Sequence, residues 1–420
     1  MTSRADRFGH PIDPAVSYAR GGILKSEIDE TLRQRHGHEL IREHVARGGD
    51  DAVFNLTGLI RGFPFKPGDD GWLRSYIHFN ARNHGELEAL ALKILGGDRQ
   101  EHDGFLATRV SAGILAIMLA TLAPDDLVLS LVPADRSHPS IRQSVELARG
   151  RFEEVIGLAA FEAALTRGAK PRLVVISTIG PSKHHLPAAE VLTAARLARG
   201  VGALLMLDDA HMAARLAYYE EAPGLALADP DVIVWSLDKH LGGPRSGFVA
   251  GRKALVDRVR ARAFALGLEA QPAQYVAGLR ALEAWDPEPI RQCGEMARRL
   301  FPWLQEATGG RAYMAGPGLA VGGEDLLELA LARAGGRRSS LVPVEAVAAA
   351  SFAMMERYGF ITIPVTGMPG AACVLRLMIY PDGLRAGNAM LMEAVAYGVS
   401  ILVEVLDQPE RARRLILGAA

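Results

Sequence analysis

The segment Asp231-Val-Ile-Val-Trp-Ser-Leu-Asp-Lys-His-Leu-Gly-Gly-Pro-Arg-Ser-Gly247 delivers one lysine, Lys239, from an apolar run into a glycine-rich turn. The apolar run is β-branched and aromatic without helical spacing, so it predicts a buried strand of a covered sheet. The Gly-Gly-Pro turn allows the backbone to approach a ligand closely. Ser236 and Asp238 flank the lysine. A lone lysine at a strand end can simply extend its amine to solvent, so its role depends on the neighbouring strands.

A second apolar run, Ala203-Leu-Leu-Met-Leu-Asp208-Asp-Ala-His211, ends in two carboxylates and a histidine. Its end is separated from Lys239 by about one loop and one strand, which is the spacing of an α/β unit. Both strand ends are therefore expected to face one crevice. An aspartate there can hydrogen-bond a protonated ring nitrogen, and a lysine amine can form a Schiff base with an aldehyde. These two groups together suit pyridoxal phosphate, whose ring nitrogen needs an acidic partner.

The same residues carry a family resemblance. Asp208-Asp-Ala-His211, followed by Lys239-His-Leu-Gly-Gly-Pro-Arg245, resembles the Asp-x-Ala-His and Lys-x-Leu-x-Gly-Pro-Arg signatures of serine hydroxymethyltransferases, which are fold type I pyridoxal-phosphate enzymes. The Asp-Lys-x-Leu-Gly-Gly-Pro form around the lysine also resembles the bacterial selenocysteine synthases. The resemblance implies that Lys239 carries the cofactor, that Asp208 and His211 contact it, and that Arg245 binds substrate. The finer family stays open.

The composition is that of an ordinary globular protein. The chain of 420 residues, 49% hydrophobic and 23% charged, is long enough for two packed domains. Its net charge of −1 and the lack of a basic stripe argue against nucleic acid or an anionic membrane as a partner. Cys293 and Cys373 have no metal-binding spacing, and the first residues do not resemble a signal peptide. We therefore expect a cytoplasmic protein without a membrane span.

Alternating strand and helix patterns predict an α/β fold in three parts. Residues 1–65 are expected to form an N-terminal arm, residues 66–265 a large cofactor-binding domain with a mostly parallel, doubly wound sheet, and residues 266–420 a linker helix and a smaller α+β domain. In the last part, strands are expected at 327–332, 360–365 and 374–379. The resemblance implies a homodimer with shared active sites, to which the arm contributes, although its length fits a simple tether equally well.

Further cofactor contacts are expected at element ends. Ser111, Ala112 and Gly113 open an apolar helix, whose free N–H groups and positive dipole end can bind a phosphate. An ordinary serine cap is the alternative. Ser177 and Ser236, each at the end of a predicted strand, are the remaining cofactor candidates.

His138 and Arg376 complete the predicted site. His138 follows a strand end, and the resemblance implies that its ring stacks on the cofactor; otherwise it is a surface residue at a helix entry. Arg376 lies among apolar neighbours and needs an anion, which the resemblance identifies as a substrate carboxylate, with a structural salt bridge as the alternative. The His184-His185 pair lacks a third ligand at a suitable spacing, so no metal is predicted.

The resemblance implies a lyase or transferase of amino-acid metabolism, in a specialised pathway. The substrate is expected to be an amino acid or a similar molecule, joined to the cofactor as a Schiff base and cleaved or exchanged at Cα–Cβ or Cβ–X. Folate motifs are not recognisable at 50–85, so folate-independent chemistry is expected. An aminotransferase or a decarboxylase is the alternative within the cofactor class. A catalytically silent scaffold subunit and an α/β enzyme without this cofactor are alternatives outside it.

Overall fold

The computed structural model describes residues 5–367 and 373–418, and the chain divides into two compact units. The sheet unit comprises residues 59–288, and the terminal unit comprises residues 1–58 together with 289–420. The first 58 residues therefore pack with the C-terminal part of the chain. This division differs from the predicted one, in which a separate arm ends at residue 65 and the large domain ends at residue 265.

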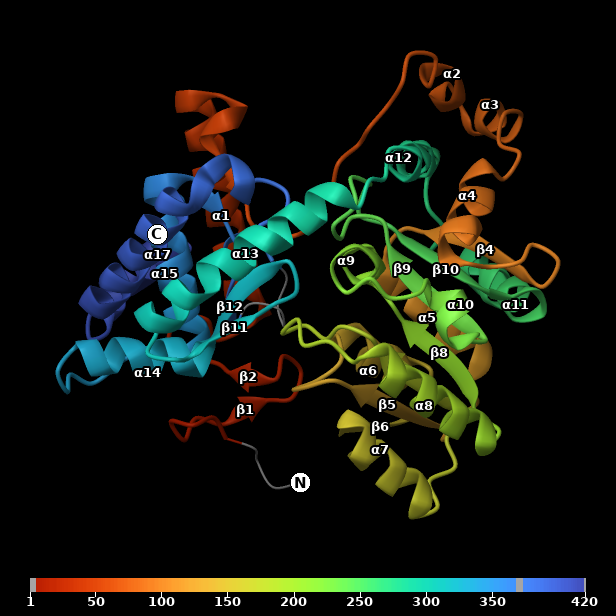
Figure 1. Ribbon diagram of the computed structural model, residues 1–420, viewed down its shortest axis with the longest axis horizontal. Helices are drawn as coiled ribbons and strands as arrows, with labels where there is room; N and C mark the ends of the chain where they lie inside the picture. Colours follow the sequence, from red (N-terminus) through yellow and green to blue (C-terminus); the bar gives the residue numbers. More distant parts are fainter. Residues whose placement is uncertain (1–4, 368–372, 419–420) are drawn as a thin grey trace. The chain divides into compact units, whose positions relative to one another are not determined.

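The sheet unit is built on a seven-stranded sheet with the order β4-β10-β9-β8-β7-β5-β6. Strand pairs from β9 to β6 are parallel, and β10 runs antiparallel to both of its neighbours. Figure 1 shows these strands among the helices of the unit. The mostly parallel sheet is thus as predicted. The strands are β4 (His102–Ala107), β5 (Leu127–Val132), β6 (Arg151–Ile156), β7 (Leu173–Ser177), β8 (Leu204–Asp208), β9 (Val232–Ser236) and β10 (Gly247–Arg252).

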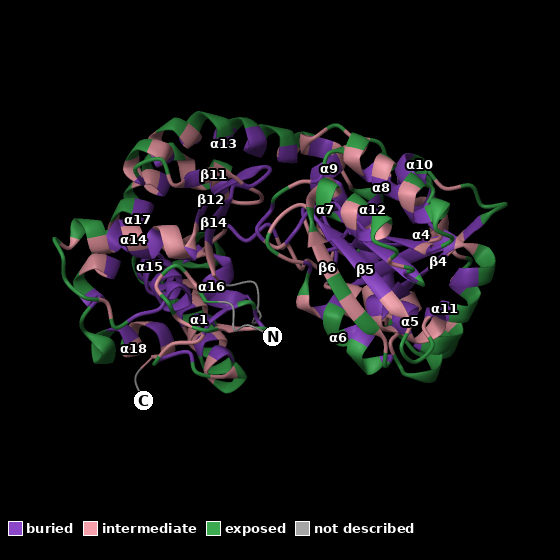
Figure 2. Ribbon diagram, turned by 90° about the horizontal axis from the view of Figure 1, so that it is seen from below, coloured by how far each residue is buried: buried purple, intermediate pink, exposed green. Residues whose placement is uncertain are grey.

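Helices pack on this sheet in two groups. On one side α5 contacts both α6 and α11, whereas α8 contacts α7 and α10 in a connected group that reaches α4 and α12. Every residue of β7 and β9 is buried, and Figure 2 shows buried strands beneath helices with exposed outer faces. The helices are α2 (Asp70–Leu73), α3 (Tyr76–Asn80), α4 (Glu86–Leu95), α5 (Val110–Thr121), α6 (Pro139–Leu147), α7 (Gly157–Thr166), α8 (Ala188–Gly200), α9 (Met212–Tyr218), α10 (Gly224–Ala228), α11 (Lys253–Ala265) and α12 (Pro272–Glu283).

The terminal unit contains a three-stranded antiparallel sheet in the order β11-β12-β14 and a short parallel pair, β13-β3. Its elements are β1 (Ile12–Asp13), β2 (Tyr18–Ala19), α1 (Glu27–Gly48), a 3-10 turn η1 (Asp50–Ala52), β3 (Phe54–Asn55), α13 (Glu288–Ala307), β11 (Ala312–Met314), β12 (Gly318–Gly322), α14 (Gly323–Arg333), α15 (Pro343–Tyr358), β13 (Phe360–Ile361), α16 (Ile363–Thr366), β14 (Val374–Met378), α17 (Gly383–Val405) and α18 (Pro409–Leu417).

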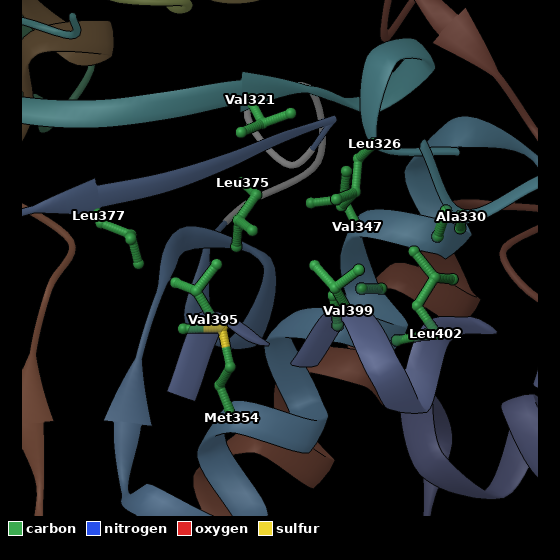
Figure 3. Packing of buried hydrophobic residues seen from close by; sticks show 14 of the residues in the cluster. Val321, Leu326, Ala330, Val347, Met354, Leu375, Leu377, Val395, Val399 and Leu402 are labelled. Atoms are coloured by element: carbon green, nitrogen blue, oxygen red, sulfur yellow. The ribbon is translucent and has the colours of Figure 1, made fainter. Parts of the chain in front are cut away.

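The core of the terminal unit lies between this sheet and α14, α15 and α17. Figure 3 shows Leu375 of β14 and Val321 of β12 directed toward Val347 and Val399 of the two long helices. The first residues of the chain join this unit through Glu345, whose buried carboxylate accepts hydrogen bonds from the N–H groups of Ile23 and Leu24 at 2.6 and 2.8 Å. A buried carboxylate is stable only when it is satisfied in this way.

Two predicted strands of the terminal unit are wrong. Residues 327–332 belong to helix α14, because Leu326, Leu327 and Ala330 form one buried helical face. The predicted strand 360–365 is limited to β13, and α16 follows it. Of the helices in the described residues, α17 alone is long and apolar enough to cross a membrane. Such a length is weak evidence, and one face of α17 packs on α15 in the core.

Candidate active site

Three parallel strands end side by side and present polar groups. Ser177 at the end of β7 is the register partner of Asp208 at the end of β8, and Asp208 pairs in turn with β9 at Val234. Ser177, Asp208 and Ser236 are all buried. The Ser177 hydroxyl lies 3.4 Å from the Asp208 Oδ2 atom. The structure thus brings together the strand-end residues that the sequence predicted.

The two adjacent carboxylates, Asp208 and Asp209, have different surroundings because neighbouring strand residues point to opposite sides. Asp209 forms a bidentate ion pair with buried Arg215, at 3.0 and 2.6 Å, and accepts a hydrogen bond from Thr178. Asp208 receives only long hydrogen bonds of 3.4 Å from Ser177 and from the Ala210 N–H. Burial raises the pKa of Asp208, while nearby Lys239 lowers it. Asp209 is therefore structural, and Asp208 is the carboxylate that remains for a ligand.

Lys239 lies in a loop that is fixed from both sides. Leu59 pairs with Lys239 in an isolated antiparallel bridge, and the Ile60 N–H donates to the Asp238 carbonyl at 2.8 Å. The Asp238 carboxylate accepts a 2.5 Å hydrogen bond from Ser236. Residues 59–62 therefore line the lysine loop, a contact that the sequence did not predict. Lys239 itself is half-buried.

Positive charge gathers beside this loop. Arg61 lies 3.7 Å from Asp238, and its pKa is lowered to about 10 by burial and by repulsion from Arg245. The pKa of Arg109 is lowered for the same reasons. Arg61 thus has one aspartate beside it and is repelled by two further arginines, and its Nε atom is buried without a hydrogen-bond partner. This excess of cationic donors fits a dianionic phosphate.

The first turn of α5 lies at the same place. A Cβ on Gly247, which follows the Arg245 loop, would meet the backbone N of Val110 at 2.5 Å, so the two backbones are in contact. Ser111 and Ala112 are in the first turn of α5, and their contact with a phosphate stays a prediction. The Gly113 N–H instead donates to the Arg109 carbonyl within the helix. A Cβ on Gly113 would also clash with Val249, so this glycine provides packing space and its predicted phosphate contact does not fit the geometry.

His138 is the N-cap of α6, and its Nδ1 atom accepts from the Ser140 N–H at 3.2 Å. The ring keeps solvent-exposed surface, although protein atoms surround it densely. Burial by these surroundings, together with repulsion from nearby cations, Lys239 first among them, lowers the pKa of His138 to about 3. A neutral ring next to Lys239 is suited to stack on an aromatic ligand.

Two residues near this site were not predicted. Lys183 is buried, and its Nζ atom lies 2.5 Å from Nε2 of His211. His240, the buried neighbour of Lys239, places its ring 6.2 Å from the His211 ring. Lys183 is on the turn after β7, and His211 comes directly before α9. The two side chains meet because of the conformation of these two loops. A lysine in a Ser-Lys-His-His turn gives no sequence signal of this pairing.

The other predicted residues are placed as follows. Arg376 lies in β14 of the terminal unit, opposite Ala320 of β12, and is 3% exposed. Its role as a carboxylate ligand stays a prediction. His184 contacts Ser182, and His185 binds Glu221 at 3.1 Å. Within residues 5–367 and 373–418, no group of three histidine, cysteine or carboxylate side chains is placed to hold a metal ion.

Comparison with known proteins places this geometry in context. The sequence model of the family "Aminotransferase class I and II" matches residues 100–306 of this chain. A "UPF0425 pyridoxal phosphate-dependent protein" of Methanothermobacter thermautotrophicus is 29% identical over 94% of this chain and 100% of its own length. Serine hydroxymethyltransferase 1 of Rhodospirillum rubrum is 28% identical over 65% of this chain and 63% of its own.

Solved structures agree with these matches. A Thermus thermophilus aspartate aminotransferase mutant superposes with a TM-score of 0.57 at 19% identity, over 89% of this chain and 96% of its own. A SepCysS structure, in complex with a SepCysE domain, gives 0.55 at 14% identity, over 87% and 98%. The chain has the fold type I architecture. The predicted fold class and the predicted resemblance to fold type I pyridoxal-phosphate enzymes are both confirmed.

Proposed function

We propose that this fold type I chain is a pyridoxal-phosphate-dependent enzyme that binds its cofactor through Lys239 and acts on an amino acid or a similar substrate. The prediction of this cofactor agrees with the names of the UPF0425 relatives, one of which aligns over its full length. The donor set fits the cofactor as well, with a lysine amine, a buried carboxylate and a cluster of arginines at one set of strand ends.

The proposal rests on the different surroundings of the adjacent carboxylates Asp208 and Asp209. Arg215 and Thr178 bind Asp209, whereas Asp208 is buried without a comparable ion pair, a costly arrangement unless a cation completes it. A protonated pyridine nitrogen supplies that cation. Because the acid form of Asp208 is favoured by burial, a cationic partner is needed to keep the carboxylate ionised.

The residues then have distinct tasks. Bound pyridoxal phosphate stabilises negative charge that develops at the Cα atom of an attached amino acid. Asp208 would hold the proton on the ring nitrogen, and the Lys239 amine would bind the cofactor and serve as a nearby base. The first turn of α5, with Arg109, Arg245 and Arg61, binds the phosphate. This assigns Arg245 to the cofactor phosphate, where the sequence indicated substrate. Neutral His138 stacks on the ring.

For the reaction, we favour cleavage or exchange at Cα–Cβ or Cβ–X. The serine hydroxymethyltransferases resemble this chain in sequence, at 26–28% identity over 65–70% of its length in two of them. The aspartate aminotransferase structure described above shares 19% identity and supports the fold alone. The aminotransferase family match over residues 100–306 keeps amino-group transfer as the second candidate. A cytoplasmic location and a role in specialised metabolism belong to the same proposal.

Borohydride reduction of the purified protein, followed by peptide mass mapping, tests the cofactor site. We expect the pyridoxyl group on Lys239. Because Lys183 is also buried near His211, the peptides must separate the two lysines. A label on Lys183, or a colourless protein that takes up no pyridoxal phosphate, contradicts the assignment.

Incubation with a panel of amino acids tests the reaction class. A lyase or exchange reaction releases an aldehyde or a β-substituent, or exchanges the side chain, and it needs no 2-oxo acid. An aminotransferase instead converts the cofactor to its amine form and requires a 2-oxo acid for turnover. Turnover that depends strictly on a 2-oxo acid would replace the first candidate with the second.

A further inference from the structure

The contact between Lys183 and His211 joins two basic side chains within the sheet unit. Nζ of Lys183 and Nε2 of His211 are 2.5 Å apart, and both residues are more than nine-tenths buried. Two nitrogens at this distance share a hydrogen bond, which needs one donor and one acceptor. A charged lysine and a doubly protonated imidazole have only donors at these atoms, so both cannot be protonated at once.

The hydrogen bond fixes the tautomer of the imidazole when the lysine is charged. An ammonium group is a donor with no lone pair, so the Nε2 atom must accept. The ring proton of His211 then resides on Nδ1. Lysine is the stronger base of the two by about four pKa units in water, so this arrangement is the favoured one.

The turn that carries Lys183 is built to hold it. Lys183 adopts a φ of +73°, in the left-handed region that favours glycine, so a lysine here carries a steric penalty that glycine lacks. Neighbouring residues fix the turn: Ser182 donates to Asp135 at 3.0 Å, and His185 binds Glu221 while stacking on Tyr219 at 3.8 Å. Strained backbone that persists in a well-fixed turn is typical of functional sites.

The pair belongs to the active site by its surroundings. His211 follows Asp208 by three residues at the end of β8, and its ring lies near that of His240. Lys183 and Lys239 both contribute to the lowered pKa of His138. The charged and titratable groups around the pair thus include Asp208, His138, His240 and Lys239.

We propose that Lys183 is a positioning residue, which donates to Nε2 of His211 and holds this histidine as the tautomer protonated on Nδ1. This inference rests on the proposed function in assigning the site to pyridoxal phosphate.

Histidine ¹⁵N NMR of the cofactor-free protein measures the tautomer directly, with His211→Gln used to assign the resonance. We expect a Nδ1-protonated ring in the wild type and in Lys183→Arg, which preserves the donor. In Lys183→Met the ring proton should move to Nε2. A wild-type ring protonated on Nε2, or an unchanged tautomer in Lys183→Met, overturns the proposal. This readout needs no cofactor, so it is independent of the borohydride test of the proposed function.

Lys183→Gly separates the amine from the backbone strain. Glycine relieves the left-handed backbone, so this variant should melt no lower than Lys183→Met, yet it should lose the tautomer in the same way. Added methylamine should restore the Nδ1 tautomer in Lys183→Gly and leave Lys183→Met unchanged, because only glycine leaves space for it. Lys170→Met, at an exposed lysine of the same unit, is the control and should alter nothing. If Lys183→Gly keeps the wild-type tautomer without methylamine, the role of the amine is refuted.

Discussion

At the scale of single residues, the adjacent carboxylates Asp208 and Asp209 should respond differently when their negative charge is removed. Asp209→Asn leaves buried Arg215 with a weakened partner, so it should cost about 3 kcal/mol of unfolding free energy or more. Asp208→Asn should leave the fold intact and abolish most activity, since an amide cannot hold the pyridinium proton. Denaturant unfolding and cofactor absorbance measure the two effects. Wild-type activity in Asp208→Asn would show that another residue faces the ring nitrogen.

A second prediction at this scale concerns how the stability of the cofactor-free protein depends on pH. Burial raises the pKa of Asp208 in the folded state, so the folded protein binds this proton more readily than the unfolded chain does. Its stability contribution is therefore present at low pH and is lost as the pH rises through the folded-state pKa. Asp208→Asn removes that loss. Its melting temperature relative to wild type should rise as the pH increases above about 4, where an ordinary aspartate ionises; a constant difference would contradict the raised pKa.

Arg376 gives a prediction about substrate binding. If it binds an α-carboxylate, Arg376→Ala should weaken amino-acid binding by on the order of a hundredfold, because a charged bidentate contact contributes a few kcal/mol. Cofactor binding should survive. Spectral titration with amino acids measures the affinity, and Arg333→Ala, at an exposed position of α14 in the same unit, serves as the control. Unchanged affinity would assign Arg376 to a structural role.

At the scale of elements, the phosphate site depends on the contact between the start of β10 and the first turn of α5. A Cβ at Gly247 would lie 2.5 Å from the backbone of Val110, so Gly247→Ala should cost about 1–3 kcal/mol and weaken cofactor binding. Gly200→Ala, at the end of α8 in the same unit, is the matched control, because no atom lies within 4 Å of its added Cβ. Fluorescence titration with pyridoxal phosphate and thermal melts measure both. Equal effects of the two changes would refute the role of this contact.

At the scale of elements, the sequence could predict some parts of the fold and of the site but not others. Lys239 and Asp208 follow apolar runs that only a buried sheet explains, so their strands and their shared edge were predictable. The run at 327–332 is short and apolar, and such runs do not distinguish a strand from a buried helix face such as that of α14. Lys183 and Arg61 join the site through turns with left-handed backbone, which local sequence preference does not encode.

At the scale of the whole molecule, we expect a homodimer formed through residues 63–77. This stretch exposes Phe63, Phe65, Leu73, Tyr76 and Ile77, with exposed fractions from 39% to 78%. It continues directly from residues 59–62, which line the Lys239 loop, so a second copy bound there would adjoin the active site. Exposed apolar patches of this kind mark interaction surfaces in soluble proteins.

Sedimentation velocity tests this arrangement. The wild type should sediment as a dimer, and a double change of Phe63→Ser and Ile77→Ser should shift it to the monomer because it removes two apolar contacts from each subunit. Phe264→Ser with Leu266→Ser removes similarly exposed apolar side chains from another part of the sheet unit and should leave the dimer intact. If the wild type is an active monomer at the concentrations used for assays, the surface at 63–77 has another occupant and each active site is complete within one chain.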